Sequence, residues 1–147
     1  MTRAKLVAYA SLTVVVALYV VGAVSATPGS LRHEVQTLPL WFPILAGLQD
    51  KPIAKWAALP CLIFWLLIMI FIWLFLLGWA QIVTGHFPPI EIAMTIIVGI
   101  GSIAGLATCL RWRTSVRPAA TATTFVVFAV LQILALRLSL MPYIAHR

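Results

Sequence analysis

Four long stretches of the chain are almost wholly apolar, and each is long enough to cross a lipid bilayer. They cover residues of about 6–24, 60–83, 90–110 and 119–136. A hydrocarbon core ~30 Å thick requires about 20 apolar residues in a helix. None of the stretches alternates polar and apolar residues, and backbone groups in lipid must be satisfied within their own segment, so helices are predicted. We expect an all-α integral membrane protein, a four-transmembrane-helix bundle that forms one membrane domain over residues 1–147.

The first apolar stretch has a second interpretation. Its basic start and the small residues Val24-Ser25-Ala26 at its end are also typical of a secretory signal peptide. The apolar run is long for such a signal and adequate for a span. We therefore expect a retained first transmembrane helix.

A proline-rich connection joins the first two predicted helices. Within it, residues 38–48 are apolar but too few to span, and Pro39 and Pro43 argue against one long undisturbed helix. We expect an interfacial segment, with Trp41 and Phe42 at headgroup depth. The alternative is a re-entrant segment that faces a cavity.

The other connections are short. Gly85 permits a turn and Pro88-Pro89 can end one helix and start the next, so the second and third helices should form an antiparallel hairpin. Pro118 suits the first turn of the fourth helix. Residues 137–147 are predicted to form an interfacial tail from which Arg137 reaches toward water.

Composition supports a lipid environment. The chain is 63% hydrophobic, and ten Lys and Arg residues oppose only three acids. The basic residues lie at the ends of apolar runs rather than along one face, which indicates lipid phosphates and excludes nucleic acid as the expected partner. The candidate headgroup-binding residues are Arg111, Arg113, Arg117 and Arg137.

With four spans, the first and third connections share one side of the membrane. That side would carry Arg32, Lys51, Lys55, Arg111, Arg113 and Arg117, whereas the other would carry Arg3, Lys5 and Arg147. The global count places both termini on the non-cytoplasmic side, although the first helix taken alone indicates the opposite orientation. The short loops suggest a bacterial inner membrane.

The third apolar stretch contains a face of small residues. Gly101 and Gly105 form a small-xxx-small pair, which Ala104 broadens and Thr108 continues. Such a face lets another helix approach closely. The partner is either the helix predicted over 119–136 or another subunit, and we favour packing within the chain.

A few polar residues fall within or beside the apolar stretches. His86, Glu91 and Gln132 are candidates for a polar or proton-conducting site. In the structural interpretation, Glu91 stabilises a helix N-terminus, His86 is hydrated at the interface, and Gln132 bonds between helices. One His and one Glu do not make a metal site, so we expect neither a metal nor another cofactor.

Two cysteines, Cys61 and Cys109, lie near the same end of the predicted hairpin. We expect two small buried side chains, and the alternative is a disulfide if that end faces an oxidising compartment.

No Ser-His-Asp, P-loop or HExxH pattern occurs in the sequence. We expect a non-catalytic accessory or assembly subunit that packs against other membrane subunits and anionic lipids. The alternative is a small oligomeric transporter or channel component with a polar route near Glu91, His86 and Gln132. A third interpretation is a lipid-modifying enzyme that uses His33, Glu34 or Asp50.

Overall fold

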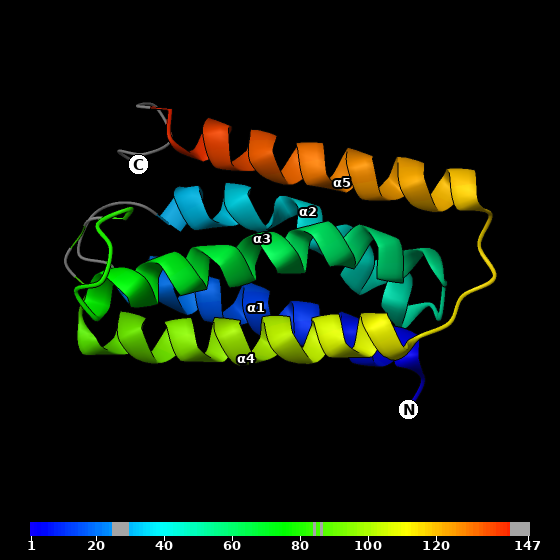
Figure 1. The fold of residues 1–147 in the computed structure, drawn as a ribbon, viewed down its shortest axis with the longest axis horizontal. Coiled ribbons are helices and arrows are strands. Elements are labelled where there is room, and N and C mark those ends of the chain that lie inside the picture. The colour runs from blue at the N-terminus through cyan, green and yellow to red at the C-terminus, as the bar shows by residue number, and fades with distance from the viewer. Residues whose placement is uncertain (25–29, 84, 86, 142–147) are drawn as a thin grey trace.

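Five helices make up the described part of the chain in the computed structural model (Figure 1). The structure describes residues 1–24, 30–83, 85 and 87–141. Four of the helices are long and apolar enough to cross a bilayer, which confirms the prediction of an all-α integral membrane protein. The helices are α1 (Arg3–Val24), α2 (Ser30–Leu48), α3 (Ile53–Leu76), α4 (Pro89–Arg111) and α5 (Pro118–Ser139), and α2 is the one outside the group of four.

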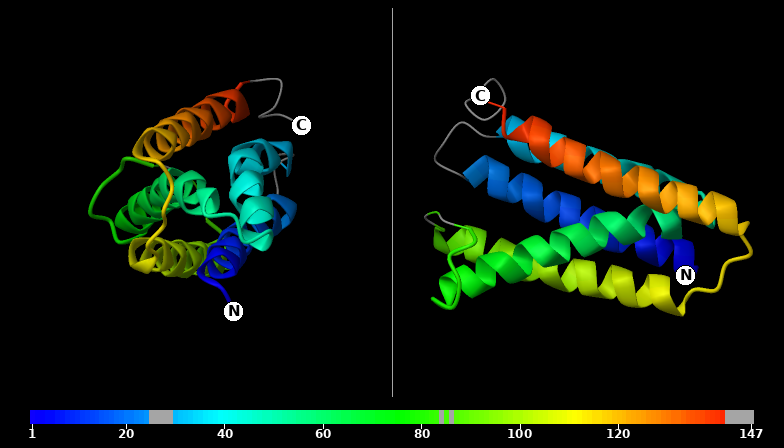
Figure 2. Two further views of the ribbon diagram at one scale, coloured as in Figure 1. Left: turned by 90° about the vertical axis from the view of Figure 1, so that its right-hand side faces the viewer. Right: turned by 45° about the horizontal axis from the view of Figure 1, so that its top comes forward.

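The third helix lies in the middle of the bundle. It contacts all four others, which follow one another around it in the order α4, α1, α2 and α5. The end-on view in Figure 2 shows α3 between α4 and α5, and these two helices do not contact each other. The bundle is therefore closed on the side of α1 and α2 and open on the side between α4 and α5.

The segment expected at the interface is part of α2, which is a continuous helix that runs lengthwise beside α1 (Figure 1). Pro39 and Pro43 lie inside this helix and are buried. Each proline removes one backbone hydrogen bond. Packing of α2 against α1, α3 and α5 offsets the lost hydrogen bonds. The sequence pattern alone does not reveal this packing. The outward side chains Leu38 and Leu45 are apolar and more than half exposed, as suits a surface that faces lipid.

The lengthwise course of α2 changes where the chain ends lie. Each of the five helices runs antiparallel to the one before it, so the start of α1 and the end of α5 lie at opposite ends of the bundle (Figure 1). The expectation that both ends of the chain share one side of the membrane assumed four lengthwise helices, and the side on which each end lies stays a prediction.

The central helix begins and ends earlier than predicted. It covers Ile53–Leu76 rather than residues 60–83. The earlier start is possible because Pro60 is accommodated inside the helix in a buried position. Gly78 follows its end with a φ of 74°, a backbone conformation that glycine adopts at low cost. Trp79, beyond this turn, is 77% exposed. The apolar run thus continues past the point where the backbone leaves the helix.

Two prolines mark the starts of the last two helices. Pro89 and Pro118 occupy the first turns of α4 and α5, where their missing N–H groups have no partner to lose. Most residues at the core of the bundle are apolar, and they come from several helices. Among the most buried are Val14, Leu40, Leu62, Cys61 and Val98.

Candidate functional site

A cluster of buried polar side chains joins α2 to α5. The side-chain nitrogen of Gln36 donates to Ser139 Oγ at 2.8 Å, and the side-chain nitrogen of Gln132 donates to the main-chain carbonyl oxygen of Gln36 at 3.0 Å. Ser139 Oγ donates to the Leu136 carbonyl oxygen at 2.6 Å. Gln36, Gln132 and Ser139, which we call the glutamine cluster, are at most 5% exposed. Hydrogen bonds of this kind hold helices together where no water competes for the polar groups.

The glutamine cluster has polar neighbours. His33, one turn before Gln36 on α2, lies beside it and within electrostatic range of Glu91 at the start of α4. His33 Nδ1 and Gln132 Oε1 are buried and have no hydrogen-bond partner among the described residues. The structure therefore places Gln132 and Glu91 toward the same end of the bundle, where His33 and Gln36 also lie. His86, the third predicted member, lies outside the described residues.

A second set of polar contacts joins α1 to α2. The hydroxyl of Tyr19 accepts from Trp41 Nε1 at 3.3 Å and from Thr37 Oγ1 at 3.4 Å. The hydroxyl of Thr37 also lies 2.9 Å from the Glu34 carbonyl oxygen. Together with the glutamine cluster, these contacts tie α2 on both sides by hydrogen bonds.

The small-residue face of α4 lies against α1. A Cβ atom on Gly101 would lie 3.2 Å from a Val14 methyl carbon, and one on Gly105 would lie 3.2 Å from Ala10 Cβ. At Gly105 the nearest atom would be Leu62 Cδ1 of α3, at 2.6 Å. The neighbours are thus α1 and α3, not the α5 helix considered from the sequence, because α4 and α5 do not touch.

The other two members of the predicted packing face have a different environment. Ala104 is exposed, and Thr108 donates to the Ala104 carbonyl oxygen at 2.8 Å within its own helix. Because only the two glycines are buried against another helix, Ala104 and Thr108 lie at the edge of the α1–α4 contact.

Most of the positive charge lies at one end of the bundle. This basic end comprises the start of α1, the turn between α2 and α3, the start of α3, the end of α4 and the connection 112–117 (Figure 1). Among the described residues, the opposite end carries only Arg32 and Arg137. The basic end carries Arg3, Lys5, Lys51, Lys55, Arg111, Arg113 and Arg117.

Two of the lysines at the basic end are engaged by other groups. Lys5 Nζ lies 3.2 Å from an oxygen of Asp50, which also accepts a hydrogen bond from Thr2. Lys55 Nζ donates to the Trp112 carbonyl oxygen at 2.6 Å and lies 4.6 Å from the centroid of the Trp56 ring. These contacts connect the start of α1, the α2–α3 turn and the end of α4.

The contact at Asp50 should depend on pH. Hydrogen bonds from Thr2 and Lys5 hold the pKa of Asp50 below its ordinary value. A carboxylate with a lowered pKa contributes stability above the ordinary pKa of about 3.9 and loses it as the pH falls through the folded value. We expect Asp50→Asn to loosen the N-terminus at neutral pH to the level that wild type reaches only in acid. Hydrogen exchange of residues 2–6 in lipid vesicles measures this effect.

The effect of Asp50→Asn should be confined to the N-terminus. The side chain of Asp50 is 44% exposed, so global stability should change little. Asp50 has a φ of 57°, which asparagine also adopts readily, so the substitution leaves the turn intact. Equal exchange in both proteins at neutral pH would contradict the anchoring role of this contact.

The remaining predicted residues are placed as follows. Arg111, Arg113 and Arg117 lie exposed at the basic end, whereas Arg137 lies exposed at the opposite end. Cys61 and Cys109 are free and buried, and Cys109 Sγ lies 3.9 Å from the Lys55 carbonyl oxygen.

Sequence reasoning missed Gln36 and Ser139. Their roles depend on α2 lying beside α5, and no local motif signals that arrangement. The described residues contain no group of three or more His, Cys, Asp or Glu residues that could hold a metal ion. No family model, no curated protein and no solved structure matches this chain.

Proposed function

We propose that this protein is a non-catalytic subunit that helps assemble a larger complex in a membrane. The observation that carries the proposal is the open side of the bundle between α4 and α5 (Figure 2). There α3 presents Ile63, Leu67 and Ile70, which follow helical spacing and are 40–46% exposed. A helix from another subunit would contact three helices at once if it packed along this strip. Close packing of that kind drives association in lipid.

The use of the polar groups supports the same proposal. The glutamine cluster and the contacts of Tyr19 join helices within the chain. From Gln132 toward the basic end, most buried side chains among the described residues are apolar. A transport route would require polar groups along the whole path. We therefore favour assembly over transport, and we assign Gln132 to helix joining.

Orientation forms part of the proposal. Positively charged connections remain in the cytoplasm. The basic end would then face the cytoplasm, with the start of α1 inside and the end of α5 outside. A bacterial inner membrane, whose proteins commonly have short loops like these, remains our proposed location. With five lengthwise helices, the charges around the first helix and the charge count over all connections indicate the same orientation. With four spans they indicate opposite orientations.

Site-specific photo-crosslinking in living cells tests the proposal. A photoreactive residue at Leu67 should give one adduct of defined mass, because that position lies in the open strip. The matched control is Leu45 on α2, which is 55% exposed, similarly apolar and far from the strip. It should give no discrete adduct.

The outcomes separate the alternatives. Adduct formation at Leu67 should fall when the neighbouring Ile70 is replaced by tryptophan, because a bulkier strip excludes a closely packed helix. An adduct with twice the mass of this chain would indicate self-association and contradict an accessory role. A lone monomer after gentle detergent extraction, with no adduct at Leu67, would also contradict it.

A further inference from the structure

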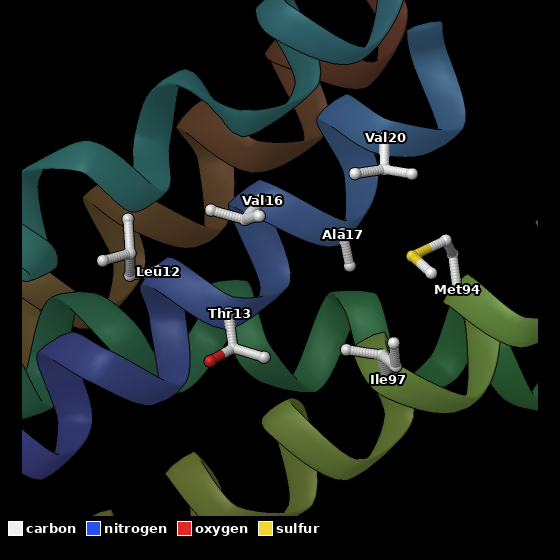
Figure 3. A pocket seen from close by; sticks show the side chains of 7 residues that line it. All are labelled: Leu12, Thr13, Val16, Ala17, Val20, Met94 and Ile97. Atoms are coloured by element: carbon white, nitrogen blue, oxygen red, sulfur yellow. The ribbon is translucent and has the colours of Figure 1, made fainter. Parts of the chain in front are cut away.

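A continuous apolar groove runs along the contact between α1 and α4. Its first part has a volume of about 420 Å³ and lies between Thr13 and Ala17 on α1 and Met94 and Ile97 on α4 (Figure 3). Its second part, of about 350 Å³, shares Thr13 and Ile97 and continues toward the basic end.

The groove is long enough to hold a lipid tail. Along α1 it extends from Leu6 to Val20, which corresponds to roughly 21 Å at a rise of 1.5 Å per residue. One leaflet provides about half of the ~30 Å hydrocarbon core. In a bilayer the acyl chains of the surrounding lipids are the apolar groups that can fill a groove of this shape. What distinguishes a bound lipid from a passing one is its headgroup.

Two arginines continue the groove-lining faces of α1 and α4 toward the basic end. Arg3 precedes Leu6 by one helical turn, and Arg111 follows Thr108, another lining residue, by one turn. Both arginines are exposed, and neither has a hydrogen-bond or ion-pair partner among the described residues. Lys5 and Lys55, by contrast, are engaged by Asp50 and by the Trp112 carbonyl oxygen. The two arginines are therefore the basic groups near the groove that remain available for a phosphate, which guanidinium groups bind with paired hydrogen bonds.

We propose that this groove binds one anionic phospholipid, with a tail along α1 and α4 and its phosphate between Arg3 and Arg111. The exposed edge of the small-residue face, Ala104 and Thr108, makes room for the tail. Gly101 and Gly105 lie deeper and bring the two helices together. The α3 strip of the proposed assembly role lies between α4 and α5, whereas the groove lies between α1 and α4, so the lipid site does not depend on a partner subunit.

Native mass spectrometry of the full chain tests this proposal. The protein is released from bilayers that contain equal amounts of phosphatidylglycerol and phosphatidylcholine with the same tails. Wild type should retain one phosphatidylglycerol. The double variant Arg3→Gln/Arg111→Gln should retain about tenfold less, since it loses charged hydrogen bonds to the phosphate. The control Arg32→Gln/Lys51→Gln removes the same number of charges and should change retention by less than about twofold, because neither residue lies within one helical turn of a residue that lines the groove.

Two further arms test the tail and the source of the phosphate. Ala104→Phe fills the groove and should abolish retention, whereas Ile103→Phe, at an adjacent exposed position outside the groove, should not. Inorganic phosphate at millimolar concentration should displace none of the bound lipid. Equal retention of the two lipids, equal losses in both double variants, retention by Ala104→Phe, or displacement by inorganic phosphate would each overturn the proposal.

Discussion

Replacing Gly47 by alanine is expected to lower the free energy of unfolding by about 1–3 kcal/mol, the usual range for overpacking a well-packed site. A Cβ atom at this position would lie 2.7 Å from the Ala4 carbonyl oxygen and 2.9 Å from Ala8 Cβ. The first of these contacts is with backbone, which cannot rotate away as a side chain can. The helices α1 and α2 would have to separate, and α2 would lose part of the packing that offsets its two prolines. Unfolding by a denaturing detergent in mixed micelles measures the change.

Gly99→Ala provides the matched control. Gly99 lies in α4, and a Cβ atom there would meet nothing within 4 Å. The free energy of unfolding of the Gly99→Ala variant should stay the same or rise by up to about 1 kcal/mol, because alanine favours a helix more than glycine does. If both variants behaved alike, the close approach of α1 and α2 at Gly47 would be disproved.

Reporters fused to the two ends of the chain are expected to place these ends on opposite sides of the membrane. A fluorescent protein at the N-terminus should be fluorescent in the cytoplasm, and alkaline phosphatase at the C-terminus should be active outside it. The reason is the lengthwise course of α2, which makes five helices between the two reporters. The charge imbalance then selects the orientation, because the basic end carries seven of the ten Lys and Arg residues.

The reciprocal fusions, with the two reporters exchanged, serve as the control and should both be silent. Replacing Arg111, Arg113 and Arg117 by glutamine should weaken the orientation preference and produce mixed populations. Reporters that both indicate the same side would contradict the arrangement and restore an α2 that does not cross the membrane.

Much of the architecture follows from hydrophobic patterning. Long apolar runs must be helices in lipid, and the turn around Gly85 with Pro88 and Pro89 predicts that α3 and α4 are antiparallel neighbours. The course of α2 was not predictable in this way. Pro39 and Pro43 normally interrupt a helix, and only contacts with distant segments make a continuous helix favourable here.

The candidate site shows the same division between local and distant information. Gln132 is conspicuous in an apolar helix, so a hydrogen bond between helices could be expected from the sequence. Its partner could not, because Gln36 reaches it only when α2 lies along α5. The two glycines of α4 indicate close packing but not the identity of the neighbour. The distribution of charge between the two ends likewise depends on the number of lengthwise helices.

The place of α3 in the bundle has a consequence for biogenesis. The segment made midway through synthesis is also the one that every other helix touches. The first two helices can therefore wait as a hydrogen-bonded pair until the third emerges and completes a stable block. The fourth then joins across a short link, and the fifth docks last, onto a surface already formed. A chain that ended after residue 111 would keep α1 to α4 and, among the described helices, would lack only α5.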